Sequence, residues 1–82
     1  MKKGIIVGNV VSTRKQESLV GSKFMEVQLI ENGLRTDRYI IAVDSVGAGI
    51  GETVLLTLGS SARLALHTPD APVDAVIVGI VD

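Results

Sequence analysis

Hydrophobic and polar residues alternate over short runs of this sequence, and turn-forming residues separate the runs. Residues 24–30 show this best, with Met25, Val27 and Leu29 predicted to face inward between polar neighbours. A period of two residues is that of a strand with one buried face. The same pattern predicts strands over residues 5–13, 24–30, 39–44, 53–58 and 73–81.

The connections carry clear signals of their own. Asn32-Gly33 predicts a hairpin turn, because both residues tolerate positive φ, and the polar residues 34–38 extend the predicted loop. Residues 60–66 are predicted as a short helix. Ser60 or Ser61 is expected to cap it by accepting a hydrogen bond from a backbone N–H group, and prolines follow its end.

The last predicted strand carries aliphatic residues on both faces. The inner set is Val73, Ala75, Ile77 and Val81. The outer set is Val76, Val78 and Ile80. A barrel strand needs one apolar face, so the outer set requires a cover, and with one short helix available the simplest cover is another subunit. Burial of each such side chain contributes about 1.5–3 kcal/mol, so three of them favour an oligomer.

Five strands with a helix between the fourth and fifth predict an all-β fold. We expect one domain over residues 1–82, a small five-stranded barrel resembling the oligonucleotide/oligosaccharide-binding (OB) fold and assembling as a ring. The OB fold has its helix between strands three and four, so the order of elements matches imperfectly.

Composition narrows the function classes. The chain is 46% hydrophobic, has no cysteine, and carries 8 basic and 9 acidic residues, for a formal charge of −1. Disulfides and thiolate metal sites are excluded, and no basic block points to nucleic acid. No apolar run has the length of a membrane span, and we expect a cytoplasmic protein.

The glycine-rich stretch 44–52 suggests phosphate binding at first sight. A dinucleotide site needs a helix after the glycines, whereas residues 53–58 read as a strand, and no Gly-Lys-Ser/Thr follows. The stretch is better explained as a connection that needs positive φ or close backbone approach.

Side chains suited to catalysis or metal binding are few. His67 with Asp70 and Asp74 does not form a recognised metal-ligand spacing, and a histidine at a helix end is explained by the helix dipole. Ser60 and Ser61 have only His67 as a candidate base, and capping accounts for both serines. We expect no catalytic residue, no metal and no cofactor.

Three segments together resemble one known family. The first runs from Asp44-Ser45-Val46-Gly47-Ala48-Gly49-Ile50-Gly51-Glu52 to Gly59-Ser60-Ser61-Ala62-Arg63, the second is residues 8–15, and the third is residues 72–82. In this order they resemble the pentameric vertex proteins of bacterial microcompartments, a family shared by carboxysomes and by ethanolamine- and propanediol-utilisation compartments. The resemblance spans nearly the whole chain.

The resemblance implies a structural, non-catalytic protein. It would form a homopentamer that caps vertices of a microcompartment shell in the bacterial cytoplasm, beside hexameric and trimeric shell proteins, with no nucleic-acid or membrane partner. Many family members continue past the closing segment, so contacts made by such an extension are not carried over to a sequence that ends at Asp82.

Candidate assembly residues come from the resemblance and from the outer face of the last strand. The family's glycine loop would allow subunits to approach closely, and its serine-rich helix start and closing strand are also matched. The candidates are Gly47, Ala48, Gly49, Ser60, Ser61, Arg63, Asp74, Val76, Val78 and Ile80.

An alternative function is a barrel module that binds single-stranded nucleic acid or a small ligand. It predicts a monomer or dimer with a specific ligand. Phe24 and Tyr39 are the sole aromatic residues available for base stacking, and the charge is slightly acidic, which disfavours this function.

Overall fold

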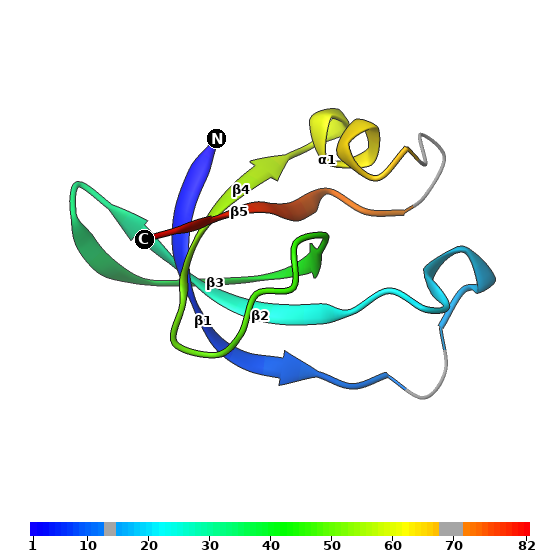
Figure 1. Cartoon of the computed structure of the whole chain (residues 1–82), viewed down its shortest axis with the longest axis horizontal. Coiled ribbons are helices and arrows are strands. Elements are labelled where there is room, and N and C mark those ends of the chain that lie inside the picture. Colours follow the sequence, from blue (N-terminus) through cyan, green and yellow to red (C-terminus); the bar gives the residue numbers. More distant parts are fainter. Residues whose placement is uncertain (13–14, 68–71) are drawn as a thin grey trace.

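The computed structural model describes residues 1–12, 15–67 and 72–82 (Figure 1). Its elements are β1 (Lys2–Val10), the 3-10 turn η1 (Glu17–Leu19), β2 (Phe24–Glu31), β3 (Leu34–Asp44), β4 (Thr53–Leu58), α1 (Ser60–Ala65) and β5 (Ala75–Val81). The strands close into a barrel in the order β1-β2-β3-β5-β4, in which β3 and β5 run parallel and the other neighbours antiparallel. The predicted barrel with one short helix before the last strand is therefore confirmed.

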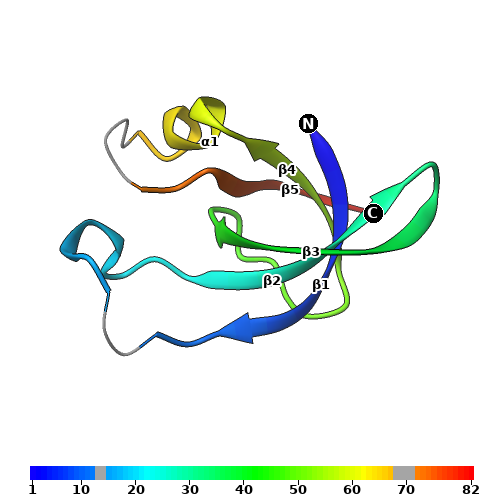
Figure 2. The same cartoon turned by 180° about the vertical axis from the view of Figure 1, so that it is seen from behind.

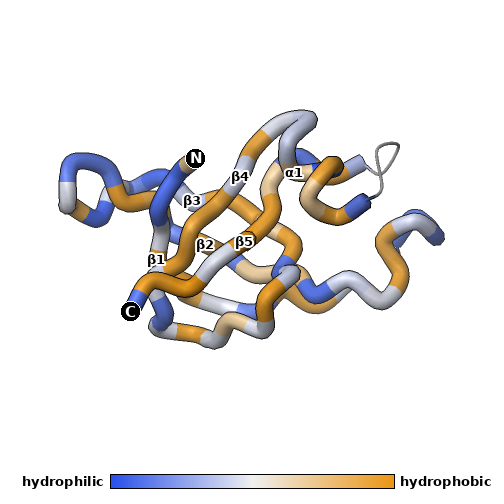
Figure 3. Tube along the Cα trace, turned by 45° about the horizontal axis from the view of Figure 1, so that its top comes forward, coloured by the Kyte–Doolittle hydropathy of each residue, from blue (hydrophilic) through white to orange (hydrophobic). Residues whose placement is uncertain are grey.

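The barrel is elongated, with principal extents of 36 × 25 × 22 Å. The β2–β3 hairpin projects from one end, and η1 and α1 lie at the other (Figures 1 and 2). Hydrophobic residues dominate β4 and β5, whereas the hairpin tip is hydrophilic (Figure 3). The two ends of the molecule therefore differ in shape and in chemistry.

The barrel interior contains the main core. The alternation predicted for β2 is confirmed, because Met25, Val27 and Leu29 are each at most 1% exposed. The fully buried members from the other strands include Ile6, Val54, Leu56 and Ile77.

The polar segment 34–38 corrects the sequence prediction. It was expected to be loop, but it forms the first part of β3. Asn32 and Gly33 make the tight turn with φ of 53° and 75°, and polar contacts across the hairpin replace an apolar face. Thr36 Oγ1 donates to Leu29 O at 2.8 Å, and Arg38 pairs with Glu31 at 2.9 Å. The exposed part of a hairpin is held by backbone pairing and needs no buried hydrophobic face. The alternation of hydrophobic and polar residues therefore did not predict a strand over residues 34–38.

A second cluster lies outside the barrel, beneath α1, and corrects the prediction for Val76. Val76 is 0% exposed and packs with Val43, Ala62 and Val73. The expected cover over this outer position is thus the chain's own helix rather than another subunit. Val73 precedes β5 and belongs to this cluster, not to the barrel interior as predicted.

A bulge in β5 overturns the prediction for the strand's end. Leu55 pairs with Gly79 and Leu56 with Ile77, so Val78 is an extra residue between them. Because one inserted residue reverses the alternation, Ile80 lies opposite buried Val54 on the inner face, although at this end of the strand it is still 36% exposed. Val81 lies opposite Thr53, on the outer face. The sequence had placed these two residues the other way round.

The predicted serine cap of α1 is also wrong. The N-cap residue is Gly59, at φ 65°, and no side chain makes a capping hydrogen bond. The N–H of Ala62 bonds to the Gly59 carbonyl at 3.1 Å. Positive φ at the cap favours glycine over serine at this position.

Candidate assembly surface

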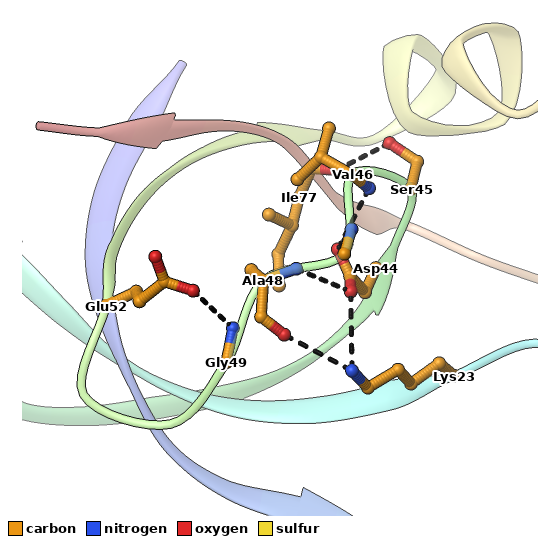
Figure 4. A network of polar contacts seen from close by, with 9 residues as sticks. Lys23, Asp44, Ser45, Val46, Ala48, Gly49, Glu52 and Ile77 are labelled. Atoms are coloured by element: carbon orange, nitrogen blue, oxygen red, sulfur yellow. Dashed lines mark hydrogen bonds and ion pairs between the residues drawn. The ribbon is translucent and has the colours of Figure 1, made fainter.

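The glycine loop between β3 and β4 is organised around one carboxylate (Figure 4). Asp44 accepts hydrogen bonds from three consecutive backbone N–H groups, those of Val46 at 3.0 Å, Gly47 at 3.1 Å and Ala48 at 2.9 Å. Lys23 Nζ lies 3.8 Å from Asp44 Oδ2 and donates to Ala48 O at 3.2 Å. The Asp44 side chain is only 2% exposed. The amides that could have held a phosphate are thus already bonded, which agrees with rejecting a nucleotide site.

Further bonds fix both ends of the loop. Ser45 Oγ donates to Ile77 O at 2.6 Å, and Glu52 Oε1 accepts from Gly49 N at 2.6 Å. Gly51 N donates to Ile6 O at 2.8 Å. The loop is therefore tied to β1 and β5 as well as to β2.

The candidates Gly47, Ala48 and Gly49 do not share one environment. Gly47 is exposed and has φ 81°, which favours glycine, whereas Gly49 is half-buried. Ala48 is 1% exposed and packs into the barrel core. Its small side chain serves the chain's own packing, which corrects the expectation of close approach to a neighbour. The loop instead exposes Val46 at 41% and Ile50 at 60%.

The helix candidates lie at the opposite end of β4 from the loop. Ser60 and Ser61 are exposed. Arg63 is half-buried and its Nη1 donates to Val73 O at 3.0 Å, so it fastens α1 to the segment before β5. Asp74 is exposed, and its carbonyl accepts from Gly59 N at 2.7 Å. The structure thus brings Asp74 next to the start of α1.

An outer apolar stripe runs across β1, β4 and β5. Leu55 is 37% and Val81 39% exposed, while Ile5 and Val78 are half-buried. Pairing of Ile5 with Thr53 and of Thr53 with Val81 puts Ile5 and Val81 in one row on the outer face, and Leu55, which pairs with Gly79, lies in the next outer row. We call Ile5, Leu55, Val78 and Val81 the outer stripe. Of the three predicted outer residues, only Val78 belongs to it.

A groove separates the first part of β3 from β4 and β5. The two parallel strands pair at Val43–Val76 and Asp44–Ile77, and before these positions β3 diverges. The resulting hollow has a volume of about 480 Å³ and includes Ile40, Ile41 and Leu58. Arg38 and Asp74 also line it. This β3–β5 groove is a second partly apolar surface, distinct from the outer stripe.

Within residues 1–12, 15–67 and 72–82, no three His, Asp or Glu side chains are grouped to hold a metal ion. Asp70, part of the metal group considered above, lies outside these ranges. No helix in the described part of the chain is long and apolar enough to cross a membrane.

The family described as "Ethanolamine utilisation protein EutN/carboxysome" matches residues 1–82. The chain belongs to this family. Carboxysome shell vertex protein CcmL of Gloeobacter violaceus is 47% identical over 83 residues, covering 100% of this chain and 83% of that protein.

Solved structures of EutN/CcmL family members have the same fold. The structure of Gloeobacter violaceus CcmL has a TM-score of 0.94 at 46% identity, covering 100% of this chain and 86% of that chain. The GrpN pentameric microcompartment shell protein from Rhodospirillum rubrum has a TM-score of 0.89 at 43% identity, covering 100% and 94%. The family resemblance seen in the sequence is confirmed, and the family is one of structural shell proteins rather than enzymes.

Sequence analysis overlooked residues that organise this EutN/CcmL chain. Asp44 carried a local signal, since an aspartate before a glycine loop often accepts hydrogen bonds from the following amides. Lys23 carried none, because it reaches the loop from the position just before β2. Val81 joined the outer stripe through the bulge in β5, which alternation alone does not reveal. Leu55 lies on the outer face by simple alternation, between the buried residues Val54 and Leu56.

Proposed function

We propose that five copies of this chain close into a ring that occupies the vertices of a microcompartment shell in the bacterial cytoplasm, beside hexameric and trimeric tiles of that shell. The observation that carries the proposal is the full-length similarity to a pentameric shell protein. A flat layer of six-fold tiles cannot close on itself, and five-fold pieces supply the curvature. The role of the protein is then geometric.

The surface of a single chain suits such a ring. A ring that closes by rotation joins two different patches of each subunit, one to the next. The outer stripe and the β3–β5 groove are two different apolar surfaces on one chain. We propose that both contribute to the contact between subunits, with Leu55 and Val81 as the most exposed members of the stripe.

The remaining candidates are proposed as contacts at the ends of the barrel. Gly47 and Gly49 shape a loop that exposes Val46 and Ile50, and we propose that this loop meets a neighbouring shell tile. Ser60, Ser61 and Asp74 are exposed near the start of α1 and are proposed as assembly contacts there.

Native mass spectrometry of the intact assembly tests the proposed function. We expect one dominant species of five chains. Coexpression with six-fold tiles from the same source should then give closed shells that contain this protein. A monomer at every concentration would overturn the proposal and favour the ligand-binding module instead.

A further inference from the structure

We propose that Asp44 is the positioning residue that holds loop 45–52 in the shape that meets a neighbouring shell tile, with Lys23 as its support. This inference rests on the proposed function, because it assigns a residue to the docking loop of a vertex protein. The Asp44 side chain touches the loop backbone and is almost completely buried, so it acts through the loop rather than on the partner.

The loop depends on Asp44 for three of its backbone hydrogen bonds. Val46, Gly47 and Ala48 follow the end of β3 and donate their N–H groups to the Asp44 carboxylate. Where the chain leaves a sheet, its backbone N–H groups no longer have a hydrogen-bond partner on a neighbouring strand and need another acceptor. A carboxylate that accepts several of them forms strong, charge-assisted hydrogen bonds. The Asp44 side chain thus accepts the hydrogen bonds that a neighbouring strand would otherwise accept.

Lys23 completes the arrangement from the other side (Figure 4). Its ammonium group contacts both the Asp44 carboxylate and the carbonyl of Ala48. It therefore links the residue just before β2 to the loop at the point where Ala48 enters the core. The carboxylate fixes the N–H groups of the loop, and the ammonium fixes one of its carbonyls.

Such a support is needed because the loop is rich in glycine. Gly47, Gly49 and Gly51 give the unfolded segment many accessible conformations, and ordering them at a contact costs free energy. A loop that is already ordered before contact avoids that cost, which strengthens binding. The exposed side chains of Val46 and Ile50 are then held in fixed positions for the partner.

The test compares full-length Asp44→Asn, Asp44→Ala and Lys23→Met with a control, Asp37→Asn. Asparagine keeps the size of the side chain but replaces one acceptor oxygen with an NH2 group, so it cannot accept from all three amides. Asp37 has an exposed carboxylate on the same strand, β3. The Asp37→Asn substitution changes the net charge of the chain by the same amount as Asp44→Asn. Three readouts are taken: the mass of the assembly, amide hydrogen exchange of residues 46–48 by NMR, and incorporation into shells on coexpression with six-fold tiles.

We expect Asp44→Asn to keep the five-chain mass, to speed exchange of the loop amides roughly tenfold or more, and to lower incorporation into shells. Lys23→Met should act in the same direction but more weakly, and Asp37→Asn should match the wild type. If Asp44→Ala fails to fold, the asparagine and lysine variants still decide the question.

Two results would overturn the inference. One is unchanged exchange of the loop amides in Asp44→Asn, which would mean that the carboxylate does not shape the loop. The other is faster exchange with normal incorporation, which would mean that docking does not need the shape. A wild-type protein that forms no pentamer or enters no shell would overturn the proposed function and the docking role together, while the exchange comparison would still report on Asp44.

Discussion

At the scale of single residues, the smallest side chains set how closely the strands of this barrel approach. Gly4 of β1 is buried and pairs with the inward-facing residues Leu29 and Val54. A Cβ atom added there would meet the Val27 side chain and lie 2.9 Å from the carbonyl oxygen of Gln28. The barrel interior at this point has room for a glycine and nothing larger.

Replacing Gly4 with alanine should therefore destabilise the fold. We expect a loss of about 1–3 kcal/mol in the free energy of unfolding, because neighbouring backbone must shift to admit the methyl group. Denaturant unfolding measures the change. Gly8→Ala in the same strand is the control, since the nearest atom to its added Cβ is Glu26 Oε1 at 3.9 Å, and it should change stability little. Equal stability of the two variants would contradict the prediction.

At the scale of elements, α1 serves as a cover for the outside of the barrel. Ala62 on its buried side packs with Val43, Val73 and Val76. Arg63 extends from the same helix to the carbonyl of Val73 and ties the helix to the approach of β5. A helix of only six residues has little stability of its own, so these tertiary contacts hold it in place.

Arg63→Ala should loosen this cover, whereas Ser61→Ala should not. Loss of the hydrogen bond to Val73 should lower the free energy of unfolding by about 0.5–1.5 kcal/mol. Loss of the packed aliphatic part of the arginine side chain should lower it further. Ser61 is exposed and makes no capping hydrogen bond. The free energy of unfolding of Ser61→Ala should therefore lie within about 0.5 kcal/mol of the wild-type value. Thermal unfolding of both variants separates the cases. A loss of about 1 kcal/mol in Ser61→Ala would instead indicate a capping serine.

At the scale of the whole molecule, the folded chain leaves apolar surface that its own elements do not cover. The outer stripe keeps Leu55 and Val81 more than a third exposed, even though the helix covers Val76. Gly79 lies beside Leu55, whose Cδ1 would be 3.5 Å from a Cβ at that position, so Leu55 lies across β5. This exposed face favours association over an isolated monomer.

Leu55→Lys should dissociate the ring while leaving the subunit folded. The substitution puts a charge into each proposed subunit contact without disturbing the barrel interior, because Leu55 lies on the outer face. Native mass spectrometry should show fewer five-chain particles, and circular dichroism should show an unchanged fold. Leu55→Met keeps an apolar side chain and should keep the ring. Val78→Lys is a less specific test, since Val78 also packs against the cluster beneath α1. A full ring in Leu55→Lys would remove the stripe from the proposed interface.

The sequence by itself determined the features that depend on neighbours along the chain. Local periodicity gives the inward positions of β2 and the location of the helix. Backbone conformation accounts for the Asn32-Gly33 turn and for the need for glycine at Gly47. The family was also readable, because its three segments lie in the same order along the chain.

Only the tertiary structure decided the features that depend on distant segments. The bulge opposite Leu55 arises from pairing between β4 and β5 and reverses the faces of Ile80 and Val81. Burial of Val76 depends on where α1 packs, and Lys23 reaches Asp44 only because β2 and β3 are paired. Periodicity describes one strand at a time, so contacts between strands, and the surface they leave exposed, are fixed only when the barrel closes.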